Sequence, residues 1–340
     1  MLDLQTLLKY DSQKMFEVYD QWPQTAKDSY NSDLRETGFI DIDHIVFAGM
    51  GGSGAIGSIF SSILSKTNIH VSQVKGYLLP RTVDSKTLVI TTSISGNTEE
   101  TLTVLNSANK LDCKIIACSS GGKIEDYCIK NKIEFRKISQ IHSPRASFAS
   151  FLYSMLKILD PIIPITPQEV NDSIIELKKL SKKISAENIS AENPALDLAE
   201  WIQGIPLIYY PVGLQAAAIR FKNSLQENAK THAMIEDVVE TCHNGIVSWE
   251  QPSNVVPILI QGNDDFIKTK ERWEILKEYF HTKNIEYKDI YSTKGSILTK
   301  LIGLIYYLDY STIYRAVLSG INPTPIESID YIKEKLKTNL

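Results

Sequence analysis

Cysteines, long hydrophobic runs and excess charge are all scarce in this sequence. Its 340 residues include four cysteines, none in a C-x-x-C pair: Cys113, Cys118, Cys128 and Cys242. This pattern argues against disulfides and structural zinc, and it fits a reducing cytoplasm. No apolar run approaches the roughly 18 residues of a membrane span, and the segment 1–5 lacks the regions of a signal peptide. We therefore predict no metal centre, no membrane span and a cytoplasmic location.

Charge and composition exclude further classes of protein. A net charge of −4 and a pI near 5.9 give no electrostatic basis for binding nucleic acid or an anionic membrane. The hydrophobic content of 43% and the mean hydropathy of −0.12 are typical of a globular protein. A chain of this length suits two domains of ordinary size, each with its own core.

A glycine-rich loop joins the first clear strand pattern to a helical one. It runs over residues 49–54 with the sequence Gly-Met-Gly-Gly-Ser-Gly. Because these glycines lack Cβ atoms, a ligand can approach the backbone closely. The free N–H groups at the helix start then favour an anion, and a phosphate is the obvious candidate. The predicted contacts are Gly51, Gly52 and Ser53.

A second loop of this kind follows the apolar run 87–92. It reads Ser-Ile-Ser-Gly-Asn-Thr over 93–98 and leads into another helical stretch. Its hydroxyls and the N–H groups at the helix start can surround a phosphate without a lysine, so we expect Ser93, Ser95 and Thr98 to bind it. Ordinary N-caps and turns explain either loop alone equally well. Two such loops, one strand–helix unit apart, favour a shared ligand.

The first loop also satisfies the dinucleotide fingerprint G-x-G-x-x-G at Gly49, Gly51 and Gly54. That fingerprint requires an acidic residue about 20 positions further on to bind the ribose. No Asp or Glu occurs between Gly54 and Val83. The sequence therefore argues against NAD, and no cofactor is expected.

Strand and helix patterns alternate along the chain. After a lead-in helix at 12–30, capped by Ser12, strands are predicted at 44–48, 71–74, 87–92, 114–119 and 134–138, with helices at 55–64, 99–109, 123–131 and 144–159. After a polar helix at 168–185, strands follow at 207–210, 255–260 and 286–290, with helices at 214–228, 269–281, 296–318 and from Pro325. The alternation predicts two α/β domains, each a mainly parallel doubly wound sheet flanked by helices. We place them at 1–160 and 195–340, joined by a linker at 161–194.

The two loops resemble those of the sugar isomerase (SIS) domain, whose phosphosugar is held by a Ser-x-Ser-Gly-x-Thr loop. Further on, Glu227-Asn228-Ala229-Lys230 and His243-Asn244 resemble the paired motifs of the bifunctional phosphoglucose/phosphomannose isomerases. Arg145, within Pro-Arg-Ala, and a lysine near the chain end complete the resemblance in family order. Gly245 departs from the family, which usually has an acidic residue there, so the loop around His243 is expected to differ.

Glu227 and the terminal helix also carry a signal of their own. Glu227 lies near the end of a helix with an apolar face, which raises a carboxylate's pKa and makes it a better base; an ordinary surface glutamate is the simpler alternative. Residues Ile326, Ile329, Ile332 and Leu336 form an apolar stripe. Lys333 projects within this stripe, where a charge needs a polar pocket, unless it reaches out to solvent.

The resemblance implies reversible isomerisation of glucose 6-phosphate and mannose 6-phosphate with fructose 6-phosphate, without metal or cofactor. Glu227 would move the proton between C2 and C1, and Arg145 would stabilise the cis-enediolate. His243, with Lys333, would open the sugar ring, while Gly52 and Ser53 line it. The resemblance also implies a homodimer. The alternatives are a non-catalytic phosphosugar-binding SIS protein and an SIS isomerase acting on another sugar phosphate.

Overall fold

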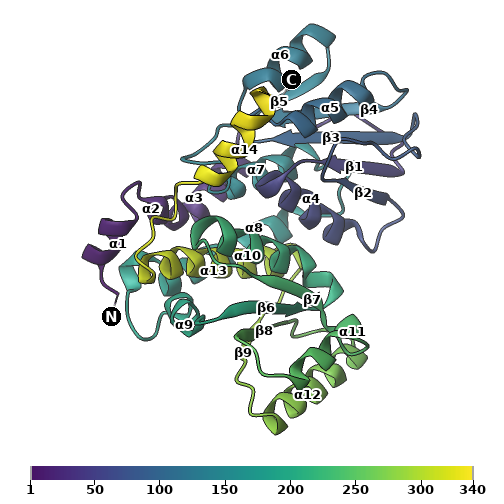
Figure 1. Ribbon diagram of the computed structural model, residues 1–340. Helices are drawn as coiled ribbons and strands as arrows, with labels where there is room; N and C mark the ends of the chain where they lie inside the picture. The colour runs from purple at the N-terminus through teal and green to yellow at the C-terminus, as the bar shows by residue number, and fades with distance from the viewer. Residues whose placement is uncertain (1, 339–340) are drawn as a thin grey trace.

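The computed structural model describes residues 2–338 and contains two parallel β-sheets with helices packed between and around them (Figure 1). The strand order is β2-β1-β3-β4-β5 in the first sheet and β7-β6-β8-β9 in the second. The strands are β1 (His44–Ala48), β2 (His70–Val74), β3 (Thr87–Ser93), β4 (Lys114–Ser119), β5 (Glu134–Lys137), β6 (Ile205–Tyr210), β7 (Met234–Asp237), β8 (Val255–Gln261) and β9 (Lys288–Tyr291). Two parallel sheets confirm the predicted α/β class.

Helices lie between most of the strands, although the segment 75–86 between β2 and β3 has none. In the first half they are α1 (Leu4–Tyr10), α2 (Met15–Asp20), α3 (Trp22–Tyr30), α4 (Gly51–Leu64), α5 (Glu99–Ala108), α6 (Gly122–Asn131) and α7 (Phe148–Ile158). In the second they are α8 (Pro167–Ile184), α9 (Pro194–Trp201), α10 (Gln215–Asn228), α11 (Val238–Thr241), α12 (Ile267–Thr282), α13 (Ile297–Leu318) and α14 (Glu327–Thr338). Within residues 2–338, none of them combines the length and apolar character that crossing a membrane requires.

Helix α13 is the centre of the core. It is buried along most of its length and packs against α8, α9 and α10, while α4 of the first half packs against both α10 and α13. One hydrophobic cluster runs through these helices and includes Ile56, Phe221 and Leu308. This shared core holds α4, and with it the glycine loop at its start, beside α10. Helix α8 lies within the stretch predicted as a linker, and the proposed domain limits remain a prediction.

The lead-in helix was predicted as one element and is two. Helix α2 ends at Asp20 and α3 begins at Trp22, because Pro23, in the first turn of α3, has no N–H to continue the earlier helix. Lys14, in a left-handed conformation, stands at the N-cap position predicted for Ser12.

The helix predicted from Pro144 also differs. It begins only at Phe148, since the Ser147 hydroxyl bonds the backbone of Ile141 and Ser143 and holds residues 141–147 as a folded loop. This correction matters for the site, because Arg145 therefore projects from that loop.

Candidate active site

The glycine loop lies at the carboxyl edge of the first sheet. Helix α4 begins at Gly51, inside the loop, and its N-cap residue Met50 provides no side-chain hydrogen bond to the first N–H groups. Gly51 has φ +52°, a conformation that favours glycine. A Cβ added to Gly52 would lie 3.3 Å from Nη1 of Arg220. Free backbone donors and a buried guanidinium therefore border the same loop, with Ser53 buried beside them.

The serine loop leaves the neighbouring strand at the same edge, because β1 and β3 pair in parallel. The hydroxyls of Ser93 and Thr98 lie 2.8 Å apart, so the loop brings these two predicted ligands together. Ser95 is exposed. Gly96, at φ +69°, packs so tightly that a Cβ there would lie 1.7 Å from the carbonyl oxygen of Gly121. The loop's conformation is therefore fixed by its packing.

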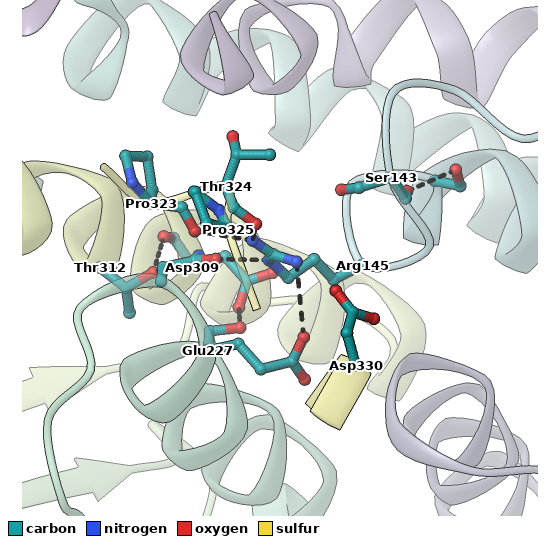
Figure 2. A network of polar contacts seen from close by, with 12 residues as sticks. Ser143, Arg145, Glu227, Asp309, Thr312, Pro323, Thr324, Pro325 and Asp330 are labelled. Atoms are coloured by element: carbon teal, nitrogen blue, oxygen red, sulfur yellow. Dashed lines mark hydrogen bonds and ion pairs between the residues drawn. The ribbon is translucent and has the colours of Figure 1, made fainter. Parts of the chain in front are cut away.

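Arg145 and Glu227 meet although 82 positions separate them in the sequence (Figure 2). Arg145 is 4% exposed, and its Nη1 lies 3.7 Å from Oε2 of Glu227. Its Nε donates to Oδ1 of Asn228 at 2.7 Å. Burial lowers the pKa of Arg145, whereas the Glu227 carboxylate raises it. The guanidinium is thus held rigidly beside the predicted base.

A buried ion pair between Arg220 and Asp309 supports the backbone at Arg145. Nη2 of Arg220 lies 2.7 Å from Oδ2 of Asp309 and also donates to the carbonyl oxygen of Arg145 at 2.8 Å. Asp309 is fully buried and accepts a further bond from Ser224 at 2.6 Å. Burial is the largest single effect and lowers the pKa of Arg220, but Asp309, Tyr19 and Glu227 together raise it above its usual range.

The sequence interpretation missed this pair. The available signal was a charged residue inside each of two strongly apolar helical stretches, Arg220 on α10 and Asp309 on α13. A buried charge in such a setting needs an opposite charge as its partner.

The other two predicted catalytic residues, His243 and Lys333, are both exposed. His243 is exposed in the turn after α11, and within residues 2–338 no hydrogen bond or ion pair joins its side chain to Glu227 or Arg145. The side chain of Lys333 is 62% exposed, and its Nζ lies 3.8 Å from Asp330. The expected burial of the α14 stripe is wrong for the single chain, since Ile332 is 57% exposed. Within the described residues no ion pair joins Lys333 to Glu227, and the roles of His243 and Lys333 stay predictions.

Gly245 stands where the resembling family usually has an acidic residue, and the structure leaves no room for a side chain there. A Cβ at this position would lie 2.3 Å from both Oε2 of Glu236 and Oγ1 of Thr241. Glu236 accepts a hydrogen bond from Thr241. A carboxylate from the end of β7 therefore occupies the space that a side chain at 245 would need. Across residues 2–338, no group of three or more His, Cys, Asp or Glu side chains is arranged to hold a metal ion.

Two family descriptions match the chain, one in its first half and the other in its second half. "SIS domain" matches residues 38–159, and "Bacterial phospho-glucose isomerase C-terminal SIS domain" matches residues 191–336. A hypothetical protein of Thermus thermophilus has a similar fold, with a TM-score of 0.72 over 99% of this chain and 90% of its own at 14% identity. The fold and the two family matches thus define a protein with two SIS domains.

Comparison with curated proteins narrows this class. The bifunctional phosphoglucose/phosphomannose isomerase of Caldicellulosiruptor bescii is 33% identical over 87% of this chain and 90% of its own length. The D-glucosamine-6-phosphate 4-epimerase of Sulfolobus acidocaldarius is 26% identical over 94% of this chain and 97% of its own. The chain belongs to the bifunctional phosphoglucose/phosphomannose isomerase family.

Proposed function

We propose that the chain interconverts glucose 6-phosphate and mannose 6-phosphate with fructose 6-phosphate, as an aldose–ketose isomerase. Membership of the isomerase family supports the reaction. The observation that carries the mechanism is the Glu227 carboxylate 3.7 Å from a buried guanidinium, Arg145. A base beside a fixed cation suits proton abstraction next to a carbonyl group, because the cation stabilises the enediolate that forms.

In the proposed mechanism Glu227 removes the proton from C2 of the open-chain aldose and returns it to C1. The hydroxyl proton passes from O2 to O1, so the reaction is balanced without a redox partner. Arg145 stabilises the cis-enediolate. The two aldoses differ only at C2 and share this enediol, so one base can serve both.

The phosphate is assigned to the serine loop. Ser93 and Thr98 already share one hydrogen bond, and with Ser95 and the start of α5 they offer neutral donors to a dianion. The sugar lies against the glycine loop at Gly52 and Ser53. Buried Arg145 and Arg220 lie beside the same loop at Gly52.

His243 and Lys333 are proposed to open the ring from a second copy of the chain or after a rearrangement. A homodimer in the cytoplasm fits this need, because His243 and the apolar stripe of α14 are both exposed in the single chain. The test mixes two variants, Glu227→Gln and His243→Ala. If His243 acts across the interface, mixed dimers recover one intact site and activity returns. Two variants that stay inactive on subunit exchange would contradict the action of His243 across the interface, and a monomer by light scattering would contradict the dimer.

The direct test of function supplies fructose 6-phosphate and measures glucose 6-phosphate and mannose 6-phosphate separately. We expect both products, and a loss of about 10²- to 10⁴-fold in kcat for Glu227→Gln. Glu271→Gln, an exposed change on α12, is the matched control and should retain full activity. Binding of the substrate without turnover would favour the non-catalytic alternative. Turnover of glucosamine 6-phosphate but not of fructose 6-phosphate would favour the reaction of the epimerase relative.

A further inference from the structure

Lys230, at the end of α10, reaches a distant part of the chain. Its Nζ donates to the carbonyl oxygen of Glu227 at 2.6 Å, close in sequence, which by itself would be an ordinary C-terminal cap. The same Nζ also donates to the carbonyl oxygens of Pro325 at 2.8 Å and Pro323 at 3.2 Å. One ammonium group therefore joins the backbone of the predicted base to the segment between α13 and α14.

Within that segment, residues 323–325 are referred to below as the strap. Arg145 grips it from the other side, since its Nη2 donates to the carbonyl oxygens of Pro323 and Thr324, both at 2.7 Å. Figure 2 shows the guanidinium between the strap and the carboxylate of Glu227. The carbonyl oxygen of Pro323 thus receives donors from two cations. Neither proline has an N–H, so the strap contributes mainly acceptors to the site.

We propose that Lys230 is a positioning residue, whose ammonium group locks the strap against Glu227 and thereby fixes Arg145 at the base. This inference rests on the proposed function. Nη2 of Arg145 donates to the strap and its Nε donates to Asn228. Only Nη1 is then directed at Glu227. If the strap moves, Nη2 loses its two acceptors and the guanidinium is free to rotate. Small displacements of this kind are costly, because a misplacement of about 1 Å can reduce turnover by about 100-fold.

The surroundings of Lys230 disfavour its positive charge. Its pKa is lowered to about 8, chiefly by lost hydration and next by the charge of Arg145, while Glu227 and Glu327 act in the opposite direction. The folded state therefore binds the lysine proton less tightly than the unfolded chain does. Below about pH 8 the charge reduces stability, and this penalty fades as the pH rises toward the unfolded pKa.

The test compares Lys230→Met, which keeps the length without the charge, with Lys230→Arg, which keeps the donors. We expect Lys230→Met to lower kcat by about 10- to 100-fold, with a smaller change in KM and no loss of melting temperature. Lys230→Arg should recover most of the activity. The arginine stays protonated, so this variant should also keep its activity above pH 8, where wild type declines. Lys268→Met, an exposed lysine of α12, is the charge-matched control.

A second measurement needs no activity. Hydrogen exchange of the peptide over 319–329 should be faster in Lys230→Met than in wild type, and restored in Lys230→Arg. Unchanged exchange and unchanged kcat in Lys230→Met would overturn the proposal. An inactive wild type whose strap still loosens in Lys230→Met would instead contradict the proposed function alone, so the two failures are distinguishable.

Discussion

The buried pair of Arg220 and Asp309 provides a quantitative test of how the site is supported. The side chains are 3% and 0% exposed, and Asp309 accepts two short bonds from the guanidinium. Changing Asp309 to Asn removes the charge and leaves Arg220 buried without a counterion. Removing one partner of a buried ion pair costs about 3–5 kcal/mol in unfolding free energy. The expected loss is therefore a large fraction of the stability of the chain.

The magnitude can be converted to a melting temperature. With about 2.1 cal/mol/K per residue, the 340 residues give an unfolding entropy near 0.7 kcal/mol/K. A loss of 3–5 kcal/mol then lowers the melting temperature by about 4–7 °C, provided that the chain unfolds in one transition. Scanning calorimetry of wild type and Asp309→Asn measures this directly.

The double variant Arg220→Met with Asp309→Leu separates charge from packing. With both charges gone, part of the lost free energy of unfolding should return, because no buried charge is left without a counterion; recovery stays incomplete because Ser224 and Tyr19 lose their acceptor. Activity should stay low, because the carbonyl oxygen of Arg145 has lost its donor. A loss below about 1 kcal/mol in Asp309→Asn, or full activity in the double variant, would refute this reasoning.

Three further substitutions have expected outcomes. Gly96→Ala should cost at least about 2 kcal/mol in chemical unfolding, because a Cβ there meets the Gly121 carbonyl and the residue has φ +69°; a neutral result would contradict the packing of the serine loop. Gly245→Ala should displace the Glu236 carboxylate and cost about 1–2 kcal/mol by the same measurement. Arg145→Lys keeps the charge but not the fork of donors, so kcat for fructose 6-phosphate should fall by about 10²-fold or more while the phosphate still binds.

Much of the fold was predictable because strand and helix periodicity is local. The glycine and serine loops follow β1 and β3, and parallel pairing necessarily brings them to one edge. Element limits failed where side chains compete with the backbone. Pro23 divides the lead-in helix, and Ser147 holds Arg145 in a loop that was predicted to be helical. These outcomes depend on individual hydrogen bonds that periodicity does not reveal.

The α14 stripe illustrates a second limit. Its spacing correctly indicates an amphipathic helix, but periodicity says which face is apolar and not what covers it. In the single chain that face is exposed, and Lys333 pairs with Asp330. The role of Lys333, like that of His243, therefore remains a prediction that depends on the assembled protein.

The sequence by itself determined the fold class and the family, because motifs and periodicity are written along the chain. Only the tertiary structure showed that Arg145 lies beside Glu227. It also showed that Arg220, paired with Asp309, binds the backbone of Arg145, and that the strap accepts hydrogen bonds from Arg145. These contacts link residues that are far apart in the sequence. Whether two distant charges meet depends on how the helices pack around α13, and that packing is a property of the whole core.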